Sequence, residues 1–157
     1  RASSSGMLYR MNDLIRRCTV LNNFMTAFFC SLDTEKNVLK YCSAGHTPPL
    51  LYRQRSGEFF ELGTKGKPLG WIDDPTFEEK EVSLLPGDRL VLYTDGVTEC
   101  MSPAKDIFGE DRLKDLIKSS ASVAPEHFSV KLVAALKGFS GSETFNDDVT
   151  LVVFDVL

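Results

Sequence analysis

The chain has 157 residues, of which 43% are hydrophobic and 25% are charged, and its formal net charge is −4 at pH 7. This length and apolar content predict one globular domain with a packed core and argue against disorder. The negative charge, without any basic stripe, argues against nucleic-acid binding. No apolar run reaches the roughly 20 residues that span a bilayer. The four cysteines form no CxxC pair, which argues against a zinc site or a disulfide framework and predicts reduced, mostly buried thiols in a cytoplasmic protein.

The first half of the chain predicts a helix followed by short antiparallel strands. The continuous apolar run at residues 24–32 predicts a strand buried on both faces, and a turn at 33–37 leads to its hairpin partner at 38–43. Residues 50–53 and 59–62 predict a second hairpin. The helix is predicted from apolar residues that recur at helical spacing, namely Met7, Leu8, Met11, Leu14, Ile15 and Cys18.

The second half predicts further strands, two helices and a closing strand. Residues 77–84 are heavily charged, as is typical of an edge strand, whereas 89–93 are apolar and predict a central one. Helices are predicted at 111–118 and from Pro125 onward. The apolar segment 150–156 predicts a last strand beside an earlier one. The order of elements predicts an α+β fold with helices covering sheets.

Two acidic sites stand out along the chain. Asp95-Gly96 follows an apolar strand, where the carboxylate is held rigidly and the glycine lets the backbone approach a ligand. Asp147-Asp148 precedes another apolar strand, and adjacent carboxylates repel each other unless a cation or hydrogen bonds compensate. Hard cations such as Mg²⁺ and Mn²⁺ prefer such oxygen ligands. Taken alone, however, Asp-Gly after a strand is usually just a turn, and Asp-Asp at the start of a strand is usually a solvated turn or a cap.

The segment from Phe24 to the end resembles the SpoIIE/RsbU-like bacterial branch of the PPM (PP2C-type) serine/threonine phosphatases. Seven motifs occur in the family's order, which chance does not readily explain. They are Phe24-Met-Thr-Ala27, Tyr41-Cys-Ser-Ala-Gly-His-Thr-Pro-Pro-Leu-Leu51, Pro68-Leu-Gly70, Leu85-Pro-Gly-Asp88, Leu92-Tyr-Thr-Asp-Gly-Val-Thr-Glu99, Phe108-Gly109 and Asp147-Asp-Val-Thr150. The resemblance implies a PP2C-like α-β-β-α sandwich of two mainly antiparallel sheets flanked by helices.

The resemblance also implies a site. Asp95 and Asp147 match the family's catalytic, metal-ligating carboxylates, with Gly96 and Asp148 as their neighbours, and the intact domain is expected to hold two Mn²⁺ or Mg²⁺ ions. His46 matches no metal ligand, and we expect it to have a structural or gating role. His127 is expected on the predicted helix, either at its surface or in packing, and Gly87-Asp88 is expected to form a turn.

The sequence departs from the family at its start. Members of this branch begin with a Gly-Asp-x-x-Asp element and an Asp-x-x-Gly-His-Gly element, and neither occurs here. We therefore expect residues 1–157 to represent the C-terminal three-quarters or less of a single domain, without its N-terminal strands. This chain alone is expected to be inactive, to bind at most one divalent ion weakly, and to self-associate, for example as a homodimer.

As the resemblance implies, the intact protein hydrolyses phosphoserine or phosphothreonine on a regulatory protein in a bacterial stress, sporulation or signalling pathway. The expected partners are a phosphorylated STAS-type anti-sigma-factor antagonist and an upstream sensor domain, which could tether the protein to a membrane. Two alternatives remain open. One is a pseudophosphatase that binds a phosphoprotein without hydrolysis, and the other is a simple α+β ligand-binding domain whose acidic residues are only turns.

Overall fold

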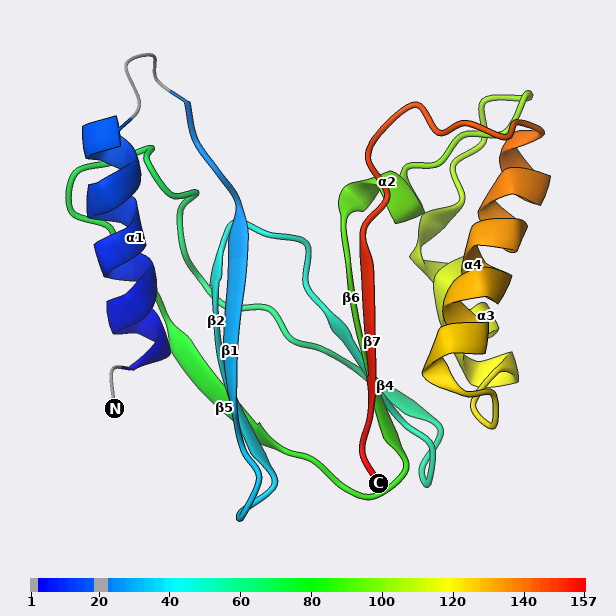
Figure 1. Ribbon diagram of the computed structural model, residues 1–157, viewed down its shortest axis with the longest axis horizontal. Coiled ribbons are helices and arrows are strands. Elements are labelled where there is room, and N and C mark those ends of the chain that lie inside the picture. Colours follow the sequence, from blue (N-terminus) through cyan, green and yellow to red (C-terminus); the bar gives the residue numbers. More distant parts are fainter. Residues whose placement is uncertain (1–2, 19–22) are drawn as a thin grey trace. The chain divides into compact units, whose positions relative to one another are not determined.

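A computed structural model describes residues 3–18 and 23–157. The chain forms two compact units, the first from residues 1–48 and 62–85 and the second from 49–61 and 86–157. Each unit contains an antiparallel sheet with helices packed beside it (Figure 1). The predicted α+β fold with two antiparallel sheets and flanking helices is therefore confirmed. Among the described residues, no helix is both long and apolar enough to cross a membrane.

The first unit is built on a three-stranded sheet in the order β1-β2-β5. Its strands are β1 (Ala27–Asp33), β2 (Val38–Ala44) and β5 (Glu79–Ser83). The predicted hairpin pairs β1 with β2 from Ala27 opposite Ala44 to Asp33 opposite Val38. Its turn is held by Asp33 Oδ1, which accepts the backbone N–H groups of Glu35 and Lys36. The charged strand β5 lies at an edge of the sheet, as predicted.

Helix α1 (Ser4–Cys18) packs against this sheet. The apolar stripe predicted for it is wrong in part. Leu8 is fully buried against Cys42, Ala44 and Leu69, but Leu14 is 61% exposed. The buried position one turn after Leu8 is taken by the polar Asn12. The Asn12 amide donates to the carbonyl of Ile72 at 3.1 Å and accepts the N–H of Gly70 at 2.8 Å, so burial is compensated by hydrogen bonds.

The prediction that residues 24–32 form a strand buried on both faces is wrong. Regular pairing begins at Ala27, Phe24 is 60% exposed, and the residues of β1 are half-buried or exposed. The reason is the position of β1 at the edge of the sheet, where it pairs with β2 only. A continuous apolar run does not distinguish such a strand from a central one.

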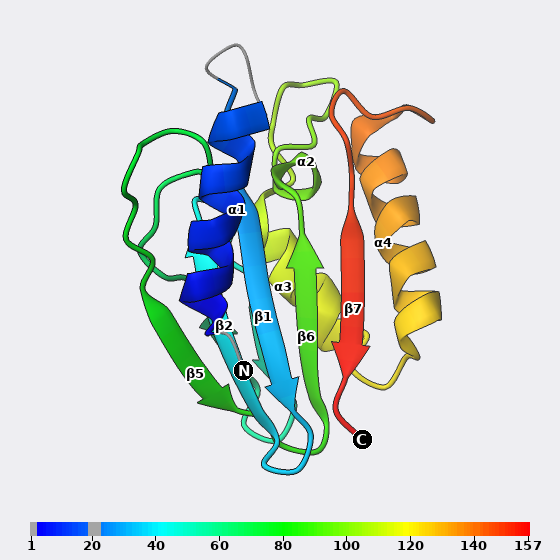
Figure 2. The same ribbon diagram turned by 60° about the vertical axis from the view of Figure 1, so that its left-hand side comes forward.

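The second unit is built on a four-stranded sheet in the order β4-β3-β6-β7. Its strands are β3 (Leu50–Arg53), β4 (Glu58–Glu61), β6 (Asp88–Tyr93) and β7 (Leu151–Asp155). As predicted, β6 has neighbours on both sides, and the last strand joins an earlier one. Strands β6 and β7 run side by side in opposite directions (Figure 2).

Helices α3 (Gly109–Ser119) and α4 (Pro125–Ser140) supply the other half of this unit's core. Pro125 begins α4 and Gly141 ends it in the left-handed conformation (φ 65°), the usual order of helix boundary signals. His127 is exposed on α4, as predicted. The buried core of the unit comprises Leu50, Tyr52, Val91, Tyr93, Val97, Phe108, Leu113, Ile117, Phe128, Leu132 and Leu136.

Two ion pairs lie at the end of this sheet where β6 begins. Asp88 was expected in a turn, but it is the first residue of β6, is 1% exposed, and pairs with Arg53 at 2.9 Å. Next to it, Arg89 pairs with Asp155 on β7 at 2.7 Å. Each buried charge therefore has an opposite charge beside it, as burial requires.

The four cysteines are free thiols, as predicted, but not all of them are buried. Cys42 is buried, Cys30 and Cys100 are half-buried, and Cys18 is exposed near the end of α1. Burial raises the pKa of Cys42 to about 11, so this thiol stays protonated at neutral pH.

Candidate functional site

The acidic residues singled out in the sequence meet in the second unit, at the end of the sheet opposite the two ion pairs. Tyr93, the last residue of β6, pairs with Leu151, the first residue of β7. The segment that follows β6 and the segment that precedes β7 therefore leave the sheet side by side. Asp95 belongs to the first segment, and Asp147 and Asp148 belong to the second.

Asp95 begins a one-turn helix, α2 (Asp95–Thr98), which the sequence analysis did not predict. Its Oδ1 accepts the N–H of Gly96 at 3.1 Å, and its backbone carbonyl accepts the N–H of Glu99 at 2.8 Å. On the facing segment, Asp147 Oδ1 accepts the N–H of Asp148 at 2.7 Å. Each carboxylate is thus oriented by the backbone amide of the next residue.

Gly96 allows the two segments to approach each other. It is buried, and a Cβ atom at this position would lie 2.6 Å from the carbonyl oxygen of Asp148 and 3.6 Å from the carbonyl carbon of Asp147. Any other residue would have to push the Asp147-Asp148 backbone away. The glycine after Asp95 is therefore required by close contact with the second acidic segment.

Thr94 ties the same two segments together, a role that the sequence analysis did not assign. Its hydroxyl donates to the carbonyl of Asp148 at 2.9 Å and accepts the N–H of Thr150 at 3.0 Å. Its own N–H donates to the carbonyl of Thr150 at 3.2 Å. The sequence signal for this role of Thr94 was its type and position: it is a polar residue with high strand propensity, directly before Asp-Gly.

The three carboxylates have no basic partner in the part of the chain that the structure describes. Asp95, Asp147 and Asp148 are exposed, and within residues 3–18 and 23–157 none of them forms an ion pair. Their oxygens are the ligands that Mg²⁺ and Mn²⁺ prefer. However, no group of 3 or more His, Cys, Asp or Glu side chains in the described residues is arranged to hold a metal ion. Among the described residues, these carboxylates would therefore supply only part of the coordination shell of a hard cation.

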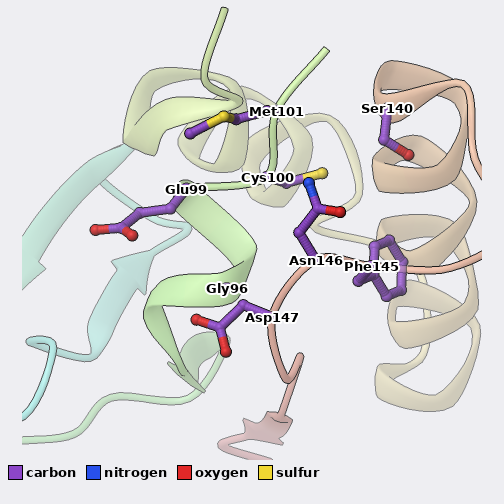
Figure 3. A pocket seen from close by; sticks show the side chains of 8 residues that line it. All are labelled: Gly96, Glu99, Cys100, Met101, Ser140, Phe145, Asn146 and Asp147. Carbon is purple, nitrogen blue, oxygen red and sulfur yellow. The ribbon is translucent and has the colours of Figure 1, made fainter. Parts of the chain in front are cut away.

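A cavity of about 150 Å³ opens beside Asp147 (Figure 3). Gly96 and Asp147 contribute to its lining, so it continues directly from the acidic site. Glu99 and Asn146 also line it. The sequence analysis assigned neither residue a role, although Glu99 ends one of the seven motifs and Asn146 directly precedes Asp147.

His46 lies in the first unit, where it closes a turn. Its N–H donates to Ser43 Oγ at 3.2 Å, and its Nδ1 lies 3.3 Å from Thr26 Oγ1. Such contacts are typical of a structural residue. The expected structural or gating role of His46 stays a prediction.

Comparison with known families finds one that matches the chain throughout. The sequence profile of the family described as stage II sporulation protein E (SpoIIE) matches residues 1–157. Among curated proteins, the chain is 29% identical over 149 residues to the phosphoserine phosphatase RsbU of Bacillus subtilis, which covers 95% of this chain and 44% of RsbU. It is 32% identical over 129 residues to protein IcfG of Synechocystis, which covers 82% of this chain and 20% of IcfG.

Solved structures show the same fold. The SiaA PP2C domain of Pseudomonas aeruginosa matches with a TM-score of 0.86 at 22% identity, covering 99% of this chain and 61% of that domain. The phosphatase domain of the cell fate determinant SpoIIE from Bacillus subtilis matches with a TM-score of 0.71 at 19% identity, covering 95% and 63%. The chain thus spans less than half the length of the curated relatives RsbU and IcfG.

Proposed function

Because the chain belongs to the SpoIIE family of PP2C-type phosphatase domains, we propose that it supplies part of the active site of a metal-dependent phosphoserine/phosphothreonine protein phosphatase. The observation that carries this proposal is the close contact of Gly96 with the Asp147-Asp148 backbone. It brings together two acidic segments that are far apart in the sequence.

In this proposal Asp95 and Asp147 hold a divalent cation, and Asp148 orients water or substrate beside them. When bound, a pair of Mg²⁺ or Mn²⁺ ions lowers the pKa of a water molecule and offsets negative charge on the phosphoryl oxygens. Asp95 is rigidly presented by β6 and α2, and Thr94 fixes its distance from the second segment. In each carboxylate, one oxygen accepts a backbone hydrogen bond. This bond fixes the orientation of the carboxylate and leaves its second oxygen available to a cation.

A two-ion site requires donors beyond those on these two segments. Paired ions in such sites lie roughly 3.5–4 Å apart and share ligands, whereas the described residues offer no cluster of 3 candidate ligands. We therefore propose that this chain alone binds one ion weakly and does not turn over phosphoprotein.

The proposed substrate is a phosphorylated anti-sigma-factor antagonist of the STAS type, in a cytoplasmic pathway. Two relatives, RsbU and RsbP of Bacillus subtilis, are named phosphoserine phosphatases, and the four free thiols suit a reducing compartment. The family resemblance also supports an upstream sensor domain as a further partner.

The test uses the natural gene product that carries these residues. Phosphate release from a phosphoserine protein should require Mn²⁺ or Mg²⁺ and should stop when EDTA is added. Release that continues at full rate in EDTA would refute the metal-dependent mechanism.

A phosphoprotein-binding module without catalysis is the second candidate, and the small donor set favours it. It predicts that the same gene product binds the phosphoprotein but releases no phosphate at any Mn²⁺ concentration.

A further inference from the structure

The cavity beside Asp147 has walls suited to an apolar side chain (Figure 3). Phe145 and Cys100 line it, and both also pack against the buried core of the second unit, so this part of the wall is firmly held. Met101 completes the apolar part and is 50% exposed. Methionine adapts its shape to an apolar partner at little cost.

The charged side chains around the cavity disfavour an acidic group in it. Among the described residues, its charged lining residues are Glu99 and Asp147, and no Lys or Arg lines it. Phosphate or an acidic side chain placed there would meet like charges without a basic partner. The cavity's own side chains therefore offer an anion no partner, and the cavity suits an uncharged group that lies next to the proposed phosphoryl site.

Asn146 offers a hydrogen-bonding group at the same place. It is exposed, lies directly before Asp147, and its side-chain amide makes no hydrogen bond within the described parts of the chain. A carboxamide can donate and accept at once, so it can pair with both the C=O and the N–H of an extended peptide. In Figure 3 the Asn146 side chain lies among the residues that line the cavity.

We propose that this cavity is a substrate subsite that takes an apolar side chain flanking the phosphorylated serine, while Asn146 binds the adjacent peptide backbone. The inference deepens the proposed function and rests on it, because Asp147 is shared between the cavity and the acidic site. Met101 is then a specificity-determining residue, Asn146 contributes affinity for every peptide through the peptide's backbone, and peptides with acidic neighbours are disfavoured.

The test measures peptide binding separately from catalysis. Fluorescent peptides carry a non-hydrolysable phosphonate in place of the phosphoserine, and Leu, Ala or Asp is placed in turn at each flanking position. Fluorescence anisotropy with the natural gene product in Mn²⁺ gives the Kd of each peptide, and hydrolysis of para-nitrophenyl phosphate reports catalysis without a peptide.

At one flanking position, Leu should bind about tenfold more tightly than Ala, the discrimination typical of an apolar pocket, and Asp should bind more weakly than either. Met101→Ala should reduce the preference for Leu over Ala. Asn146→Ala should raise the Kd of all peptides about tenfold, as loss of backbone hydrogen bonds predicts. The matched control is Ile107→Ala, because Ile107 is 53% exposed and pairs with Met101 across the same loop but does not line the cavity.

The proposal is overturned if no flanking position prefers Leu, if Asp is preferred, or if Ile107→Ala lowers the selectivity as much as Met101→Ala. Thermal unfolding of each variant identifies a loss of fold, which would lower the binding of all peptides without changing the ratio between Leu and Ala. Failure of the wild-type protein to hydrolyse para-nitrophenyl phosphate in Mn²⁺ would contradict the proposed function and would leave the measured peptide preference to decide the subsite.

Discussion

The two ends of the four-stranded sheet treat their carboxylates in opposite ways. Where β6 begins, Asp88 pairs with Arg53 and Arg89 pairs with Asp155, and three of these four side chains are at least 80% buried. Where β6 ends, Asp95, Asp147 and Asp148 are exposed, and no cation of the described chain pairs with them. Paired charges in a buried place hold the strands together. We propose that the unpaired carboxylates at the other end are kept for a ligand.

The largest expected difference between the two ends is in activity. Asp95→Asn in the natural gene product should lower the rate of phosphoprotein hydrolysis about 100-fold or more, because a charged metal ligand is lost. Without metal, its thermal unfolding temperature should be no lower than that of the wild type, because the substitution relieves repulsion between carboxylates. Normal hydrolysis by this variant would show that Asp95 is not a ligand.

At the end of the sheet where β6 begins, the expected effect is on the free energy of unfolding. Arg89→Met removes the ion pair with Asp155 and the donors to the carbonyls of Ser120 and Val123. It leaves a carboxylate without its partner, and the free energy of unfolding should fall by about 3 kcal/mol, as measured by urea denaturation. Metal binding per folded molecule should remain as in the wild type. A variant that unfolds like the wild type would contradict the role given to this end.

A smaller effect is expected at the connection between β6 and β7. Thr94→Val keeps the shape of the side chain but removes its bonds to Asp148 and Thr150. Losing two hydrogen bonds should lower the free energy of unfolding by about 2 kcal/mol and should also weaken Mn²⁺ binding. Thr76→Val, at an exposed threonine of the first unit, serves as the control. Equal effects in both variants would argue against a special role for Thr94.

The contrast between the ends could be predicted from the sequence only in part. The strands, the hairpin turns and both acidic sites follow from local patterns, because apolar runs, glycines and turn residues act over a few positions. The approach of the Asp95 segment to the Asp147 segment depends on β6 pairing with β7 across three intervening helices, which no local pattern contains. The family resemblance implied that Asp95 and Asp147 belong to one site. The pairing of Tyr93 with Leu151 gives the physical reason why their segments lie side by side.

Burial was the least predictable property. Asp88 looked like a turn residue, since its partner Arg53 lies in a strand far away in the sequence. Asn12 broke the apolar stripe of α1 because the backbone of Gly70 and Ile72 supplies its hydrogen bonds. Phe24 stayed exposed because the paired part of β1 begins after it. In each case the partner that decides burial comes from another segment.

The effect with the narrowest range is confined to alkaline pH. Burial, followed by the charges of Glu110 and Glu61, raises the pKa of Tyr93 from 10.0 to about 12. The folded state holds this proton more tightly than the unfolded state, so the contribution to stability is complete below pH 10 and is lost as pH rises toward 12. Tyr93→Phe should flatten the fall in unfolding temperature over that range. An unchanged pH profile would show that other groups cause the fall.

The most direct test of the central claim is titration of the 157-residue chain with Mn²⁺ by isothermal calorimetry. The account predicts weak binding of one ion, lost in Asp95→Asn and in Asp147→Asn and retained in Asp115→Asn, whose exposed carboxylate lies on α3. Binding that survives both site substitutions, or tight binding of two ions by the chain alone, would contradict it.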